Sequence, residues 1–179
     1  MVVILTGGLN LSLGALGVSA AMFGGWCMQS LGIPIIPSIF LILLFGTFLG
    51  WINGYVTVKT GVHSFIVTLA TMSIYFGFMT VLTQAQSFKH LPEAFTDIGS
   101  MKLFYKYVSP LLLLSLFTGC ILFYLFKFTD IGRKLIAAGA NPIAAELSGI
   151  SVNRMFVYCH MLSGFLAAVA GIMVTMRIG

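Results

Sequence analysis

Long apolar segments, each of a length that crosses a bilayer, constrain this chain more than any other feature. They are Ser38–Tyr55, Val62–Leu82, Val108–Phe126 and Phe156–Met176. A transmembrane helix needs about 20 mainly apolar residues, and in hydrocarbon only helices and closed barrels satisfy every backbone polar group. Of the residues, 59% are hydrophobic and 7% are charged, whereas soluble domains carry about 25% charged residues. We therefore predict an all-α, polytopic bundle of membrane helices forming a single domain, residues 1–179.

A fifth, broken span is expected at the start, in Met1–Gln29. Its apolar beginning is interrupted by TGGLNLSLG, Thr6–Gly14, before the apolar residues resume. A break at membrane depth is tolerated only where protein covers it or a wet cavity adjoins it, and such breaks often mark substrate sites in transporters. Alternatively, the break lies at the membrane interface and a side chain caps the following helix. Thr6, Asn10 and Ser12 are candidates for the substrate pathway, and the last two are also candidates for the cap.

Polar side chains share one face of the third span. Ser64, Thr68, Thr71 and Tyr75 are spaced four, three and four residues apart, which is the spacing of neighbours on a helix face. Such a stripe could line a substrate pathway. Serine and threonine in membrane helices also bond to carbonyls of the preceding turn, and the sequence leaves both interpretations open.

Small residues recur every four positions on two other spans. Lipid provides no hydrophobic drive between helices, so membrane bundles are held by close packing, which small residues allow. We expect both faces to be helix-packing faces. They consist of Gly46, Gly50 and Gly54 on the second span, and of Ser163, Ala167 and Gly171 on the last span.

His160 lies on the packed side of the last span. An ionisable group at membrane depth is a functional candidate by default. No second histidine or carboxylate occurs on the same span, so we favour a neutral ring that is hydrogen-bonded across a helix interface over a ligand or proton carrier.

The segment Asp130–Arg154 encodes a short, capped helix that faces water. Asn141 is a suitable N-cap, Pro142 fits the first helical position, and Gly149 supplies a left-handed stop. We expect about two turns of helix between these signals.

An apolar ridge runs along this short helix. Ile143 and Leu147 are four residues apart and share a face, whereas Glu146 and Ser148 point elsewhere. Such a ridge suits a groove in a partner protein, although a helix can also serve only to shorten a connection between two spans. The candidate contact helix comprises Asn141, Pro142, Ile143, Ala144, Ala145, Glu146, Leu147, Ser148 and Gly149.

Basic residues set the expected orientation. Lys59 and the four basic residues of 127–154 fall on one side of the membrane by alternation of the spans, and the three lysines of Gln84–Tyr107 fall on the other. Cytoplasmic loops carry an excess of lysine and arginine. We therefore place the capped helix in the cytoplasm and the Gln84–Tyr107 segment outside.

Several function classes are excluded or disfavoured. The net charge of +5 is thinly spread along the chain, so we expect no nucleic-acid partner. The sequence lacks the Gly-x-x-x-x-Gly-Lys-[Ser/Thr] loop of ATP-binding proteins and the Gly-x-Ser-x-Gly and His-Glu-x-x-His motifs of hydrolases. We expect no catalytic residue, cofactor or metal in this chain, and any ATP chemistry belongs to a partner.

Several stretches carry a family resemblance. They are TGGLNLSLG at the start, GWINGYVTVKTGVHSFIVTLATM in the middle, and IGRKLIAAGANPIAAELSGISVNR followed by SGFLAAVAGI. Together they resemble the permease subunits of ribose- and xylose-type bacterial ABC sugar importers, which are related to branched-chain amino acid ABC permeases. The resemblance covers nearly the whole chain, and the third stretch is its most specific part.

The resemblance implies a multi-pass subunit of the bacterial cytoplasmic (inner) membrane that forms the translocation pathway for a simple sugar. The implied partners are membrane lipid, a second permease copy, either identical or related, cytoplasmic ABC ATPase subunits and an extracytoplasmic sugar-binding protein. In this interpretation Asn141–Gly149 is the coupling helix on which an ATPase docks. A branched-chain amino acid ABC permease, and a channel or secondary transporter without an ATPase, stay open as alternatives.

Two positions depart from the family pattern. Ile143 stands where family members often carry an acidic residue, and Asn10 stands where they often carry aspartate. We therefore expect no charge-dependent role at either position. The family's chains are also longer, with spans before and after the part seen here, so we expect this chain to be incomplete at both ends.

The orientation can be tested with single cysteines in a background that lacks Cys27, Cys120 and Cys159. A cysteine introduced by Ser148→Cys should react with a membrane-impermeant thiol reagent only after the cells are permeabilised, because the loop faces the cytoplasm. Reaction in intact cells would contradict the predicted orientation.

Overall fold

The computed structural model describes residues 2–85, 95 and 109–178. Within this part of the chain, all regular secondary structure is helical. The predicted all-α membrane bundle is thereby confirmed. The helices long and apolar enough to cross a membrane are α2 (Ile35–Thr60), α3 (Ser64–Leu82), α5 (Pro110–Phe128) and α8 (Val152–Ile178).

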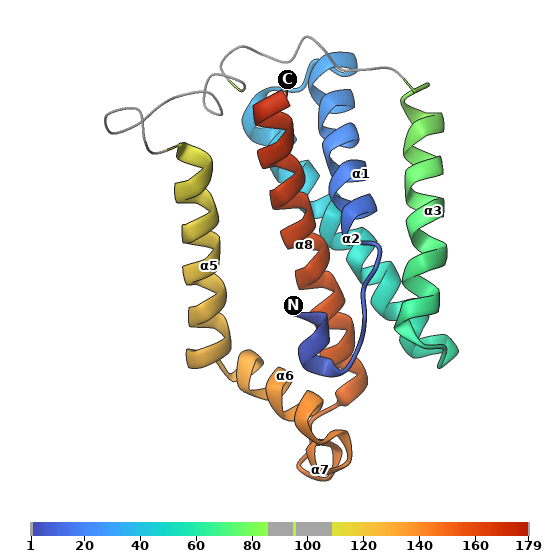
Figure 1. Ribbon diagram of the computed structural model, residues 1–179, viewed down its shortest axis with the longest axis vertical. Coiled ribbons are helices and arrows are strands. Elements are labelled where there is room, and N and C mark those ends of the chain that lie inside the picture. Colours follow the sequence, from blue (N-terminus) through green and yellow to red (C-terminus); the bar gives the residue numbers. More distant parts are fainter. Residues whose placement is uncertain (1, 86–94, 96–108, 179) are drawn as a thin grey trace.

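The first span is broken, as predicted. A 3-10 helix, η1 (Val3–Thr6), is followed by a non-helical segment and then by α1 (Leu13–Gly25), which continues into the π-helical turn η2 (Trp26–Ser30). Gly7 ends η1 with φ 76°, a left-handed conformation that glycine adopts without steric cost. Figure 1 shows α1 starting partway along α8, so the break lies inside the bundle and not at its end.

Helix α2 is longer than the predicted span Ser38–Tyr55 and includes residues on both sides of it. Pro37 lies in the first turn of α2, where the backbone amides have no intrahelical partner, so its missing N–H costs nothing. Lys59 lies in the last turn of the same helix, which ends at Gly61 with φ 68°. The segment Gln84–Tyr107, predicted to face the outside, falls almost wholly outside the described residues.

The glycine face of α2 lies directly against α8. A Cβ atom at Gly46 would overlap Ala168, and one at Gly50 would overlap the backbone carbonyl of His160. A Cβ at Gly54 would come within 2.8 Å of a Cα atom of α8. The backbones of α2 and α8 therefore touch, which no larger residue at these positions would permit.

A different face of α8 packs on α1. A Cβ atom at Gly171 would overlap the carbonyl of Gly17, and one at Gly17 would lie 3.2 Å from the carbonyl of Ala167. Ser163 lies on the same face and contacts the break through a hydrogen bond. Two neighbouring helices thus approach α8 closely on two of its faces, and α8 is the central helix of the bundle (Figure 1).

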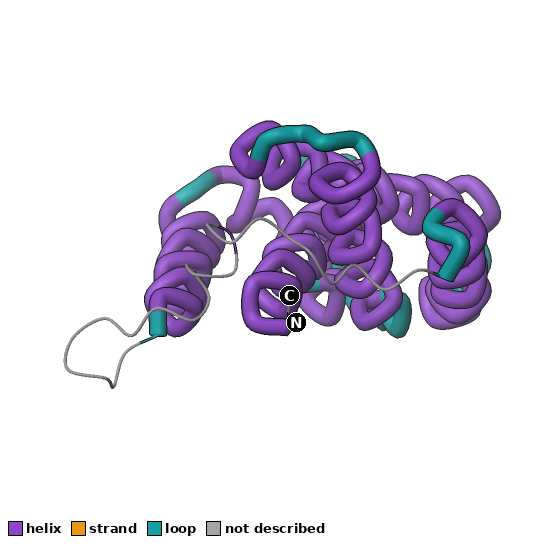
Figure 2. Tube along the Cα trace, turned by 90° about the horizontal axis from the view of Figure 1, so that it is seen from above, coloured by secondary structure: helices purple, strands orange, loops and turns teal. Residues whose placement is uncertain are grey.

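Two short helices lie at the end of the bundle where α2 turns into α3 (Figure 1). They are α6 (Asp130–Ala140), which follows α5 after Thr129, and α7 (Pro142–Leu147), which precedes α8. The sequence patterns did not indicate α6. Its Leu135 and Ala138 are buried, and the helix packs on η1 and α8. The α5 helix stands at one side of the bundle and reaches it mainly through α6 (Figures 1 and 2).

Gly50→Leu should disrupt the bundle, because the new side chain would start inside the space occupied by the His160 carbonyl. Overpacking of this kind costs about 1–3 kcal/mol, and more where a backbone has to shift. Leu44→Ile changes an exposed position on the same helix and should be nearly silent. The measurement is the yield of monodisperse protein after extraction in mild detergent, and equal yields for the two variants would contradict the packing argument.

Candidate functional site

The polar stripe of α3 satisfies the broken backbone of the first span. The amide of Leu9 donates a hydrogen bond to Ser64 Oγ (3.0 Å), and the amide of Leu11 donates to Thr68 Oγ1 (3.2 Å). Both hydroxyl-bearing residues are buried. An unpaired amide in such surroundings costs about 1–3 kcal/mol, so these hydroxyls replace the water that the break would otherwise need.

Asn10 and Ser12 begin a chain of hydrogen bonds that crosses the bundle. Asn10 Oδ1 accepts from the amide (3.0 Å) and the hydroxyl (2.7 Å) of Ser12, and Asn10 Nδ2 donates to Ser163 Oγ on α8 (3.3 Å). Asn53 Nδ2 on α2 donates to Ser12 Oγ (2.8 Å), and Tyr75 on α3 donates to Asn53 Oδ1 (2.8 Å). Side chains from three spans therefore converge on the break.

The break is a contact between helices and not an interfacial cap. Ser12 directly precedes α1, but its hydroxyl donates to Asn10, and in the described part of the chain neither side chain caps α1. The capping interpretation is therefore wrong. The physical reason is that Asn53 and Ser163 offer these polar groups partners inside the bundle.

Two of the predicted pathway residues bond within their own segments. Thr71 donates to the carbonyl of Thr68 (3.2 Å), and Thr6 donates to the carbonyl of Val3 (3.0 Å). Tyr75, one turn beyond Thr71, instead reaches α2. In the polar stripe, Thr71 therefore bonds to its own helix. Ser64, Thr68 and Tyr75 bond to other segments of the bundle.

Asn53 is a central member of the network that the sequence patterns did not bring out. It is fully buried, and it lies directly before Gly54 in the helix-packing face. The available signal was a single amide side chain deep within an apolar span, where a polar group is costly unless it finds a partner. Periodicity alone does not identify such a residue, because Thr57, one turn further on, is buried on the same face but bonds back to the Asn53 carbonyl.

Two cavities adjoin these residues. One of about 310 Å³ lies where the break meets the ends of α2, α3 and α8, and one of about 670 Å³ lies between α1 and α8. The larger cavity is apolar, with Ser163 as its polar residue. The smaller cavity has polar side chains in its wall, namely Thr57, His63, Ser64 and Asn153.

His160 is fully buried, and its ring packs against Phe156 with the ring centroids 4.9 Å apart. Neither ring nitrogen has a hydrogen-bond partner among the described residues. The expected hydrogen bond across the helix interface is therefore not formed there. Gly50 and Gly54 of α2 face this part of α8, and glycine has no side-chain polar atom to offer.

The short helix α7 has caps at both ends. Asn141 Oδ1 accepts from the amide of Ala144 (3.0 Å). At the other end Gly149 has φ 80°, and the amide of Ile150 donates to the carbonyl of Ala145 (2.9 Å). This is the Schellman arrangement, and it fixes the direction in which the chain leaves α7.

The apolar ridge of α7 is uncovered. Ile143 is 74% exposed and Leu147 is 86% exposed, whereas Ala145 between them is buried. The helix is therefore held to the bundle by one face and presents two large apolar side chains on another. The predicted ridge is therefore present and exposed at the end of the bundle.

The sequence was compared with known proteins. It matches the family described as "Branched-chain amino acid transport system / permease component" over residues 1–179. The ribose import permease protein of Haemophilus influenzae is 37% identical, over 98% of this chain and 55% of the relative. The fructose import permease protein of Rhizobium meliloti is 33% identical, over 99% of this chain and 51% of the relative.

A further relative, the autoinducer 2 import system permease protein of Salmonella typhimurium, is 30% identical, over 99% of this chain and 54% of the relative. The chain spans about half the length of these relatives. No solved structure matches it. Because the family match extends over the whole chain and the fold is a bundle of membrane helices, the chain belongs to the branched-chain amino acid transport system permease component family.

Proposed function

We propose that this chain forms the membrane-spanning part of an ABC importer permease that carries a simple sugar across the bacterial cytoplasmic membrane. The observation that carries the proposal is the uncovered ridge of Ile143 and Leu147 on a capped helix at the end of a membrane bundle. The relatives named for ribose and fructose import support a sugar as the substrate class.

In this proposal the chain provides the pathway and no catalysis. Separate cytoplasmic ATPase subunits hydrolyse ATP, an extracytoplasmic binding protein delivers the sugar, and a second permease copy completes the pathway. An amino acid substrate is less well supported, because the relatives described above are named for sugars and for autoinducer 2. A channel or secondary transporter would have no need of an exposed docking ridge.

Movement of α7 would be transmitted to α8 through a short and stiff connection. Ile150, directly after the Schellman turn, packs against the buried cluster that includes Leu135 and Met155. These two residues belong to α6 and α8, so α7 cannot move without shifting both. Because packed interfaces shift between discrete arrangements, a displacement at this end is carried along α8.

The break is where such a displacement would reach the substrate. Ser163 of α8 accepts the hydrogen bond from Asn10, and the network continues to Asn53 and Tyr75. Sugar hydroxyls both donate and accept hydrogen bonds, and neutral polar groups of this kind can exchange partners with them. We propose that the pathway passes these residues. Its candidates, beside Asn53, are Thr6, Asn10, Ser12, Ser64, Thr68, Thr71 and Tyr75.

The double variant Ile143→Asp/Leu147→Asp should abolish docking of the ATPase. It places two carboxylates in an apolar contact, at a cost of several kcal/mol if they stay unpaired. Co-purification with the ATPase and ATP-driven uptake should both fall at least tenfold, while insertion and yield stay unchanged because no span is altered. The matched control Ile143→Leu/Leu147→Ile keeps the ridge apolar and should behave like the unmodified protein. Full ATPase retention by the Asp variant would favour the channel or secondary-transporter interpretation.

Tyr75→Phe should weaken sugar uptake without harming the fold. It removes the donor to Asn53 Oδ1, and one hydrogen bond is worth about 0.5–1.5 kcal/mol, which corresponds to a change of up to about tenfold in the KM of uptake. Thr80→Val removes an α3 hydroxyl that bonds to the carbonyl of Phe76 in the same helix and is no pathway candidate, so it serves as the control. If both variants have the same KM of uptake as the unmodified protein, the network has a structural role only and does not contact the sugar.

A further inference from the structure

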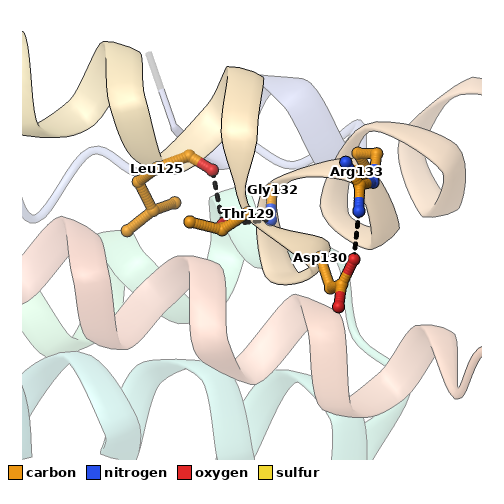
Figure 3. Close-up of polar contacts among 5 residues, drawn as sticks. All are labelled: Leu125, Thr129, Asp130, Gly132 and Arg133. Atoms are coloured by element: carbon orange, nitrogen blue, oxygen red, sulfur yellow. Dashed lines mark hydrogen bonds and ion pairs between the residues drawn. The ribbon is translucent and has the colours of Figure 1, made fainter.

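The corner between α5 and α6 is a rigid elbow. Thr129 Oγ1 donates to the carbonyl of Leu125 (2.5 Å) and accepts from the amide of Gly132 (3.2 Å), as Figure 3 shows. A Cβ atom at Gly132 would overlap the backbone of Leu125 and Phe126. The first turn of α6 is therefore pressed against the last turn of α5, and α6 leaves α5 in a fixed direction.

Basic side chains are concentrated at this elbow. Residues 127–134 contain three basic residues and one acidic residue, so their net charge is three minus one, or +2. Arg133 pairs with Asp130 on the exposed side of α6 (Figure 3). Lys134 is exposed and forms no ion pair with any residue that the structure describes. Lys127 lies with its Nζ atom 5.1 Å and 5.6 Å from the centres of two aromatic rings.

Exposed aromatic side chains lie around Lys127. Phe123 and Phe128 supply the two rings beneath the Lys127 ammonium. Tyr124 stacks on Phe128 with the ring centroids 5.5 Å apart, and the two residues are 63% and 56% exposed. Ile131, on the first turn of α6, is exposed as well. Aromatic rings beside lysine and arginine at the end of an apolar span are typical of the membrane–water interface.

The elbow is exposed on its outer side in the part of the chain that the structure describes. Of the residues of α5, Leu111 at the far end is the one that is buried in the described structure. The helix stands at one side of the bundle (Figure 2) and contacts α6 at the elbow, where Phe123, Tyr124 and Phe128 are exposed. The position of α5 therefore depends on the elbow and on the surrounding lipid.

We propose that the elbow, residues 123–134, binds the headgroup of an anionic phospholipid. Lys127 and Lys134 contact the phosphate, and the exposed rings with Ile131 contact the upper part of the acyl chains. The net positive charge is complementary to the negative surface of the cytoplasmic leaflet. That this leaflet is the cytoplasmic one rests on the proposed orientation of the chain. Since α6 leads into α7, a bound lipid would also hold the helix that presents the Ile143 and Leu147 ridge.

The test uses the full-length permease in lipid nanodiscs of phosphatidylcholine with a rising fraction of phosphatidylglycerol. The measurement is the number of phosphatidylglycerol molecules retained per protein, by mass spectrometry of the intact complex. Lys127→Gln/Lys134→Gln should raise the lipid fraction needed for half-saturation by about tenfold or more, because each lysine near an anionic surface changes affinity about fivefold. Lys127→Arg/Lys134→Arg keeps both charges and should retain the lipid.

Lys59→Gln is the matched control, because Lys59 is an exposed lysine over one aromatic ring, at the same end of the bundle but on α2. An equal loss of lipid in this control would overturn the proposal in favour of general surface attraction. Unchanged lipid binding in the Lys127→Gln/Lys134→Gln variant would also overturn the proposal. If that variant lost ATPase binding at the same time, the two lysines would belong to the ATPase contact and not to a lipid site. Because lipid retention is measured without ATPase or transport, a failure here is separate from a failure of the proposed function.

Discussion

Backbone contact between α8 and its neighbours is the interaction on which the rest of this structure depends. Gly46, Gly50 and Gly54 bring α2 against one face of α8, and Gly17 and Gly171 bring α1 against another. In a membrane such contacts must supply the packing energy, because lipid tails are as apolar as the side chains that they would replace. The close approach has a second effect, since it brings polar groups of α2 and α8 within hydrogen-bonding distance of Asn10 and Ser12 in the break.

The broken first span shows how that close packing is used. Its backbone amides at Leu9 and Leu11 need partners in a region without water, and the hydroxyls of α3 supply them. Asn53 and Ser163 then connect the break to two further helices, α2 and α8. In the proposed mechanism the same helix that is packed most tightly, α8, links this polar region to α7 at the end of the bundle. A rigid central helix between a docking surface and a polar break is an arrangement suited to transmitting movement.

Much of this could be predicted because hydrophobic length and local capping act over short stretches of sequence. The spans of α2, α3, α5 and α8 follow from apolar runs, and the cap at Asn141 and the stop at Gly149 follow from single residues. The α6 helix was missed because its apolar face is short and is completed only by packing on η1 and α8. The alternative that Asn10 or Ser12 caps α1 was wrong because the Ser12 hydroxyl donates to Asn10 and accepts from the distant Asn53.

The sequence by itself determined that the chain is a bundle of membrane helices, where most of the helices lie, and that a capped helix presents an apolar ridge. These features depend on side-chain hydrophobicity and on backbone preferences, which each segment carries alone. Only the tertiary structure decided which polar residues meet. Asn53 lies 41 residues from Ser12 and 22 residues from Tyr75 in the sequence, and no local pattern relates them. Likewise, the His160 ring has no hydrogen-bond partner among the described residues. The reason is that Gly50 and Gly54, which face it from α2, have no polar side-chain atoms.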